Sequence, residues 1–262
     1  TSTSWGTVNC KPSRIVAFNR LITQSRYANP SHSIKEPTVT TPRIYEVISI
    51  ADIYVYGTSL SSTLMMCACS INQSPIFSRE ALQSIDIDST EQYNIPSIVL
   101  MENATKGAAT IILDSTDAQV QNKIVILCGR GNNGGDGYGV ARHLANAGCN
   151  ISILQLGEPT RKDAMINASI CSAMQLSQAT WTEDKCNNTT LFIDAIFGTG
   201  LDRTVTGVYA DAIHVCNAHL SPCISLDIPS GMDCDSGLPL GCCIEAAMTI
   251  SFVGMKLGFL EE

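Results

Sequence analysis

The 262-residue sequence lacks the features that mark several large classes of protein. No apolar run approaches 18 residues, so no membrane-spanning helix is expected. Lysine and arginine number 16 against 24 aspartate and glutamate residues, and the net charge of −8 argues against a general nucleic-acid binder. No internal repeat is found. The length allows one large domain, or one domain with an appendage.

Cysteine is abundant, but the spacing typical of a metal site is missing. None of the twelve cysteines forms a CxxC pair, and the close pairs Cys67 with Cys69 and Cys242 with Cys243 are too near to be ordinary paired ligands. Several other cysteines lie inside apolar, strand-like runs, where buried free thiols are common. We therefore expect reduced thiols rather than a disulfide framework, and an intracellular protein that is mitochondrial or cytoplasmic.

The first 77 residues differ in composition from the rest of the chain. They carry six basic and three acidic residues, whereas the chain as a whole is acidic. Residues 1–44 are rich in serine and threonine and hold a single acid, Glu36. This composition is typical of an organellar transit peptide, and a disordered tail is the alternative. The sequence thus predicts an N-terminal extension over residues 1–77 and a globular domain over residues 78–262.

From Ser78 onward, apolar runs of strand length alternate with segments of helical spacing. Helices are predicted from Ser78, from Ser97, after a glycine-rich loop, and over residues 161–176 and 206–218; strands are predicted over residues 123–128, 150–156, 191–196, 223–228 and 245–253. Alanine, isoleucine and methionine are expected on the inner face of the 161–176 helix. The alternation predicts an α/β fold with a mostly parallel central sheet that is covered on both faces.

The glycine-rich loop follows the first buried strand and covers residues 129–137, with the sequence GRGNNGGDG. Five of these nine residues are glycine, whose backbone can lie against a ligand because it has no Cβ. The helix that follows would present free N–H groups and a positive dipole end, which favour phosphate. The combination predicts a nucleotide-type site.

Two further strand ends also combine glycine with short oxygen-bearing side chains. Asp194 lies in a strand followed by residues 198–201 (GTGL), and Asp227 begins the segment DIPSG, which contains Ser230. In an open α/β sheet, ligands bind at the carboxyl ends of strands, so the three segments are expected to share one site. Oxygen donors such as Asn133, Asp194 and Ser230 could hold a hard cation, and a single carboxylate among neutral oxygens suits a monovalent ion.

A conventional NAD(P)-dependent oxidoreductase is an alternative. Gly129, Gly131 and Gly134 match the GxGxxG fingerprint, and Glu158 lies near the position of a ribose-binding acid. Against this, the loop is crowded with polar side chains, among them Asp136, which would repel an anion. No Tyr–Lys or His proton relay is evident either.

The motifs resemble those of the YjeF N-terminal domain family, the NAD(P)H-hydrate epimerases. The segments that carry the resemblance are residues 100–104 (LMENA), 132–137 (NNGGDG), 194–201 (DAIFGTGL), 227–231 (DIPSG) and 249–258 (TISFVGMKLG). The resemblance covers about residues 78–260. It implies a three-layer α/β/α Rossmann-like fold, often homodimeric, that interconverts the R and S epimers of hydrated NADH and NADPH.

The resemblance also implies which residues form the site. Substrate contacts are implied for Asn132, Asn133, Gly134, Gly135, Asp136, Gly198, Thr199, Gly200, Leu201, Asp202, Arg203, Thr204 and Asp227. A potassium ion is implied at Asn133, Asp194 and Ser230, in agreement with the hard-cation interpretation. Asp227 is the candidate catalytic acid/base, with a ribose or ion ligand as its alternative role. Lys106 and Lys256 are weaker candidates for phosphate contacts, and His143 and His214 are expected to be structural.

The sequence departs from the family pattern at three places. Thr105 stands where glycine is frequent, Arg130 where proline is usual, and Ala247 where aspartate is frequent. The family's usual partner, an ATP- or ADP-dependent hydrate dehydratase, is absent from the sequence, so a separate partner enzyme is expected. The alternative function is a non-catalytic nucleotide-binding or protein-interaction scaffold, but the intact glycine loop and ion ligands favour the enzyme. The preference between NADH-hydrate and NADPH-hydrate is left open.

Overall fold

The computed structural model describes residues 15–18, 75–116 and 122–260. Most of the predicted N-terminal extension, and with it the transit-peptide prediction, lies outside the described residues. No helix within the described ranges is both long enough and apolar enough to cross a membrane.

The core of the fold is a seven-stranded sheet in which every pair of neighbouring strands is parallel. The strand order is β1-β8-β7-β6-β3-β4-β5. The strands are β1 (Ile15–Phe18), β3 (Lys123–Cys128), β4 (Asn150–Gln155), β5 (Ser177–Thr180), β6 (Leu191–Ala195), β7 (Cys223–Leu226) and β8 (Met248–Phe252). Two short strands, β2 (Ile76–Phe77) and β9 (Met255–Lys256), form a separate parallel pair.

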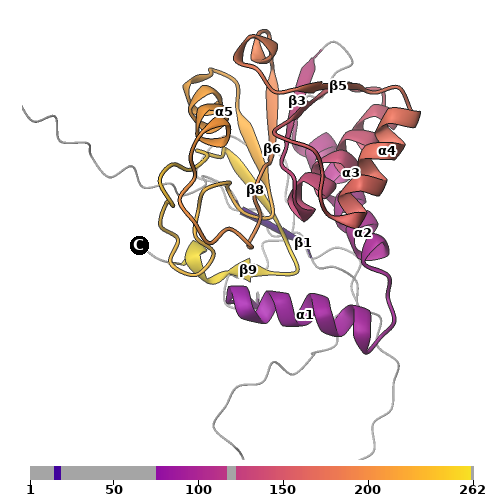
Figure 1. The fold of residues 1–262 in the computed structure, drawn as a ribbon, viewed down its shortest axis with the longest axis vertical. Helices are drawn as coiled ribbons and strands as arrows, with labels where there is room; N and C mark the ends of the chain where they lie inside the picture. Colours follow the sequence, from indigo (N-terminus) through magenta and orange to yellow (C-terminus); the bar gives the residue numbers. More distant parts are fainter. Residues whose placement is uncertain (1–14, 19–74, 117–121, 261–262) are drawn as a thin grey trace, which may run out of the picture.

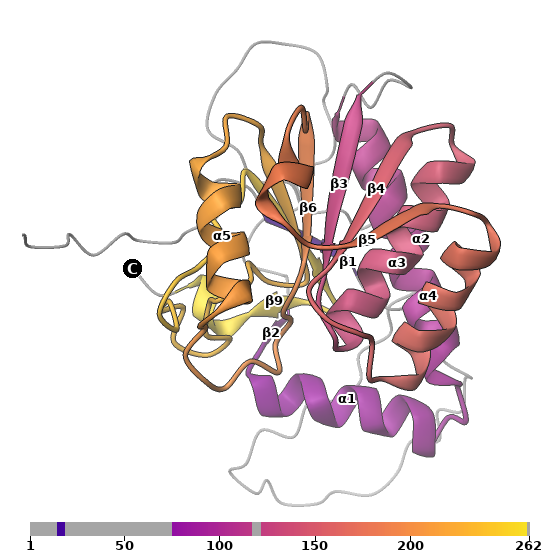
Figure 2. The same cartoon turned by 45° about the horizontal axis from the view of Figure 1, so that its top comes forward.

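Helices cover both faces of the sheet (Figure 1). They are α1 (Arg79–Glu91), α2 (Ser97–Ser115), α3 (Asn132–Asn146), α4 (Lys162–Ala173) and α5 (Val208–Ala218), with 3₁₀ turns at Glu183–Cys186 and Leu257–Phe259. Figure 2 shows α2, α3 and α4 on one side of the sheet and α5 on the other, while α1 lies across one end. The predicted three-layer α/β/α architecture is confirmed.

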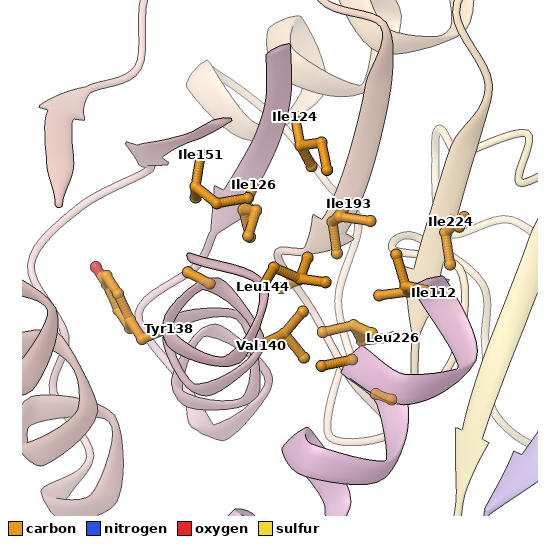
Figure 3. Close-up of a cluster of buried hydrophobic side chains, with 14 of the residues drawn as sticks. Ile112, Ile124, Ile126, Tyr138, Val140, Leu144, Ile151, Ile193, Ile224 and Leu226 are labelled. Carbon is orange, nitrogen blue, oxygen red and sulfur yellow. The ribbon is translucent and has the colours of Figure 1, made fainter. Parts of the chain in front are cut away.

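The alternation of side chains along β3 shows why the sheet needs both helical layers. Ile124, Ile126 and Cys128 face α2 and α3, whereas Val125 and Leu127 face α5, and all five are 0% exposed. A strand buried on both faces is therefore continuously apolar. Figure 3 shows the first of these two layers, where isoleucines from neighbouring strands meet side chains of α2 and α3.

The prediction for the inner face of α4 is only partly correct. Its buried positions are the small or polar residues Ala164, Asn167, Ala168 and Cys171, whereas its isoleucines and Met165 are exposed. The reason is the closeness of α3, because a Cβ built on Gly135 would lie 2.9 Å from the Ala164 Cα. Such an approach leaves room for small side chains only.

Several short elements were not predicted from the sequence. The edge strand β5 is the polar segment Ser177–Thr180, which has no apolar alternation. Strands β1 and β2 precede residue 78 and pair with β8 and β9, far along the chain. These strands form because they pair with distant strands of the sheet, and their short local sequences carry no clear strand pattern.

Candidate functional site

The candidate site lies where the chain leaves the sheet in two opposite directions. Strand β3 is flanked by β4 and β6; the chain continues from β3 into α3 on one face and from β6 towards α5 on the other. This arrangement is the topological switch point at which open α/β sheets bind ligands. The two turns are in contact, since the Gly129 N–H donates to the Ala195 carbonyl at 3.0 Å.

The glycine-rich segment is mostly helix rather than loop. Helix α3 begins at Asn132, so the turn after β3 is confined to residues 129–131, and the prediction of a loop reaching Gly137 is wrong. The glycines allow close packing of the helix. A Cβ on Gly134 would lie 1.9 Å from the Gly129 carbonyl oxygen, and one on Gly137 would lie 2.6 Å from the Ala195 Cβ. Tertiary packing here outweighs the low helix propensity of glycine.

The predicted substrate-binding residues fall into two groups, one after β3 and one after β6. In the first turns of α3, Asn132 is exposed while Asn133, Gly134, Gly135 and Asp136 are buried. After β6, half-buried positions are followed by mostly exposed ones: Gly198 and Thr199 are half-buried, Gly200, Asp202, Arg203 and Thr204 are exposed, and Leu201 is buried in the apolar layer beside α5. The contact of these residues with a dinucleotide stays a prediction.

Asp194 is the centre of a buried polar cluster. Its carboxylate is 0% exposed and accepts hydrogen bonds from the Ser230 hydroxyl at 2.5 Å, the Ser230 N–H at 2.8 Å, the Ser225 hydroxyl at 2.7 Å and the Ile196 N–H at 3.2 Å. Burial raises the pKa of Asp194, and these hydrogen bonds oppose the shift. The cluster ties the turn after β6 to the turn after β7, and it brings together Asp194 and Ser230 as the sequence predicted.

Asn133 joins this cluster from α3. Its amide nitrogen donates to the Phe197 carbonyl at 2.9 Å and to the Leu226 carbonyl at 3.3 Å. Its amide oxygen is buried and has no hydrogen-bond partner among the described residues. The Ser230 hydroxyl also lies 3.2 Å from the Phe197 carbonyl oxygen. This unsatisfied amide oxygen, together with the carbonyl, hydroxyl and carboxylate oxygens of the cluster, provides the kind of oxygen ligands that suit a hard monovalent cation.

Asp227 follows β7 in a strained backbone conformation, with φ at +67°. Its Oδ1 lies 2.7 Å from Lys256 Nζ, and its Oδ2 accepts a hydrogen bond from the Thr199 N–H at 3.3 Å. A Cβ on Gly198 would lie 2.9 Å from Asp227 Oδ2, so a larger residue at position 198 would displace the carboxylate from this position. Strain of this kind in non-glycine residues is concentrated at functional sites. The side chain is 16% exposed, which leaves it open to a ligand.

The ion pair of Lys256 with Asp227 was not predicted from the sequence. Lys256 is 1% exposed and donates to the Phe252 carbonyl at 2.7 Å, so the prediction that it contacts a phosphate is wrong. A lysine within the apolar segment SFVGMKLG was the signal that could have revealed a buried, paired ammonium. Lys106, the other phosphate candidate, is exposed on α2.

Glu102 of α2 is engaged outside the site rather than free in solvent. Its carboxylate pairs with Arg142 and lies 3.0 Å from His143 Nε2, both on α3. Partial burial alone would raise the pKa of Glu102, but the hydrogen bond and charge of Arg142 leave it lowered. Burial lowers the pKa of His143. This cluster joins α2 to α3, which agrees with the structural role expected of His143; His214 is exposed on α5.

Comparison with known proteins gives a consistent result. Residues 97–258 match the model of the family described as YjeF-related protein N-terminus. A Limosilactobacillus fermentum protein named NAD(P)H-hydrate epimerase is 37% identical over 183 residues, which cover 69% of this chain and 86% of that protein. A protein of the same name from Rhodopirellula baltica is 35% identical over 193 residues, covering 71% and 78%.

A longer curated protein and a solved structure are also similar to this chain. A Moorella thermoacetica protein named bifunctional NAD(P)H-hydrate repair enzyme Nnr is 38% identical over 189 residues, covering 68% of this chain and 36% of that protein. The crystal structure of yeast ynu0 aligns with a TM-score of 0.63 at 23% identity, covering 70% of this chain and 82% of the yeast chain, and supports the shared fold. The chain belongs to the family of YjeF-related protein N-terminal domains.

Proposed function

We propose that this protein is an NAD(P)H-hydrate epimerase, an isomerase that interconverts the R and S forms of hydrated NADH and NADPH. The observation that carries the proposal is the position of the Asp227 carboxylate. It is partly exposed and lies between Lys256 and the turn after β6, at the switch point of the sheet. Relatives that carry this name match more than three-quarters of their own length. The site retains the carboxylate, the glycine turn and the buried oxygen cluster that a scaffold would have no need to keep.

In the proposed reaction, Asp227 assists the transfer of a hydroxyl group from one face of the hydrated nicotinamide ring to the other. In the hydrate, the hydroxyl is bound to the carbon beside the ring nitrogen. When the C–O bond breaks with its electron pair on oxygen, a proton converts the leaving group to water and the ring becomes an iminium-like cation. Water then adds to either face and releases a proton. Asp227 would stabilise the cation, take up that proton and supply the one that the next departing hydroxyl needs, so no proton is consumed overall.

We also propose that a potassium ion is held by Asn133, Asp194 and Ser230. The support is the unsatisfied buried amide oxygen of Asn133 beside a cluster with one carboxylate. A bound ion would supply a fixed positive charge where α3, the turn after β6 and the turn after β7 meet. The expected effect is a higher melting temperature in potassium chloride than in choline chloride of the same concentration.

Two partners complete the proposal. One is a hydrate dehydratase that consumes the epimerised product, in line with the bifunctional name of the Moorella thermoacetica relative, of which the match covers only 36%. The other is a second copy of this chain. Met165, Ile166 and Ile170 are 54%, 36% and 37% exposed on the outer face of α4, an apolar surface suited to a homodimer. Sedimentation of the wild type and Ile166→Lys tests the dimer.

The activity is tested by incubating the protein with the purified R- and S-hydrates and following their ratio by chromatography, with and without potassium. We expect equilibration well above the spontaneous rate, and its loss in Asp227→Asn. Equilibration at the spontaneous rate by well-folded wild-type protein would instead favour the scaffold.

A further inference from the structure

Lys256 is a buried lysine whose hydrogen-bonding capacity is fully used. The chain turns sharply between β8 and β9, where Val253 has φ at +68°, and this turn folds the lysine back over the end of β8. Its Nζ donates to the Phe252 carbonyl at 2.7 Å and to the Gly254 carbonyl at 3.4 Å, and it lies 2.7 Å from Asp227 Oδ1. An ammonium group has three N–H donors, so none is left for a ligand.

Among the residues that the structure describes, Lys256 is the one cation that forms an ion pair with Asp227. Among the described residues near the pair, Arg79 is engaged by Asp233 at 2.5 Å, and its backbone N–H donates to Asp235 at 2.8 Å. The Cys234 thiol is buried beside the pair, and burial raises its pKa to about 12, so it is uncharged at neutral pH. The negative charge of Asp227 is therefore balanced by Lys256.

Stability is a weak explanation for this pair. Removing an ammonium and a carboxylate from water costs free energy that their attraction only partly returns, and well-packed apolar side chains often stabilise a core equally well. Geometry gives a better explanation. Because Lys256 occupies Oδ1, the carboxylate is turned so that Oδ2 faces Thr199 and Gly198, in the turn implied to contact the dinucleotide.

We propose that Lys256 is a positioning residue of the epimerase reaction, which holds the Asp227 carboxylate through Oδ1 and so presents its Oδ2 to the substrate. Lys256 itself touches no substrate, because its donors are all engaged within the protein. The proposal rests on the proposed epimerase function and adds to it the residue through which Asp227 is controlled.

The test compares Lys256→Met, Lys256→Gln, Lys256→Arg and the control Lys185→Met. Lys185 is half-buried and donates to the Thr180 carbonyl at the far edge of the sheet, away from Asp227, so its loss should leave the rate unchanged. Removing the charge in Lys256→Met should lower kcat by about 100-fold with KM within about threefold, the pattern of an interaction needed in the transition state. Lys256→Gln keeps a donor without charge and carries the same test if the methionine variant fails to fold. Lys256→Arg should recover at least about tenfold of the loss, because it retains the charge.

The double variant Asp227→Asn/Lys256→Met separates positioning from general damage to the fold. If Lys256 acts through Asp227, the second substitution should cause no further loss of rate beyond that of Asp227→Asn. Wild-type kcat in a folded Lys256→Met or Lys256→Gln, or equal losses in the arginine and neutral variants, would overturn the positioning role while leaving the epimerase function intact. A wild-type protein that does not accelerate epimerisation would overturn both.

Discussion

A Cβ placed on Gly134 would lie 1.9 Å from the carbonyl oxygen of Gly129, so the first turn of α3 rests directly on the end of β3. The glycine at this position is required by backbone packing, whether or not a ligand is bound. Gly131 differs, because a Cβ there would meet nothing within 4 Å. Packing therefore requires glycine at position 134 but not at position 131.

This difference gives the first prediction. Gly134→Ala should lower the free energy of unfolding by about 3 kcal/mol, because the added methyl group cannot fit without moving the backbone. Gly131→Ala should change it by no more than about 0.5 kcal/mol. Urea denaturation measures both values. If Gly131→Ala retains stability but raises KM for the hydrates, the glycine turn contacts the substrate as predicted; equal stability of both variants would contradict the packing argument.

The second prediction concerns the buried cluster around Asp194. The Ser230 hydroxyl donates to Asp194 at 2.5 Å and accepts from the Phe197 N–H at 2.8 Å. Ser230→Ala should lower the free energy of unfolding by about 2 kcal/mol, because the buried Asp194 carboxylate and the half-buried Phe197 N–H each lose a partner. It should also abolish the rise in melting temperature caused by potassium. Ser236→Ala, at an exposed serine, is the matched control, and an unchanged potassium response in Ser230→Ala would remove Ser230 from the ion site.

The third prediction concerns the stability of the Lys256–Asp227 pair. Asp227→Asn leaves the ammonium of Lys256 buried without its counter-charge, and it should lower the free energy of unfolding by about 2 kcal/mol. The further substitution Lys256→Met should restore much of this loss, because it removes the unpaired charge. Thermal or urea unfolding of the single and double variants measures the effect. Additive losses in the double variant would show that the two side chains do not form the pair in solution.

The fourth prediction is a dependence of stability on pH. Burial lowers the pKa of His143 below its ordinary 6.5, and Arg142 holds the pKa of Glu102 below its ordinary 4.5 despite the opposing effect of burial. Both groups bind protons less readily in the folded state than in the unfolded state, so acid favours unfolding. The free energy of unfolding should fall as the pH drops below 6.5, and again below 4.5.

His143→Gln isolates the first of these two steps. Glutamine can still hydrogen-bond to Glu102, but it does not titrate. The variant should lose less stability than the wild type between pH 7 and pH 5, as measured by urea denaturation at each pH. The same decline in both proteins would assign the effect to other groups.

Much of the site could be predicted because its residues lie at fixed places in recognisable local patterns. A helix was expected to begin at Ser78, and the Ser78 hydroxyl caps that helix by accepting from the Ala81 N–H at 3.3 Å. Asp194 and Ser230 were expected at the ends of neighbouring strands, and the parallel sheet brings them into contact. Such predictions succeed because capping, alternation and strand ends depend on residues close together in the chain.

The sequence by itself determined the α/β fold, the family and the strand ends at which the site is built, since each follows from short-range pattern or from motifs. Only the tertiary structure decided that α3 begins within the glycine run, that α4 turns its small residues inward, and that Lys256 is buried against Asp227. These features depend on how closely distant segments approach one another. The glycine run forms a helix because its lack of side chains lets the helix pack closely against a neighbouring backbone. Lys256 belongs to the site because the chain brings it into contact with the Asp227 carboxylate.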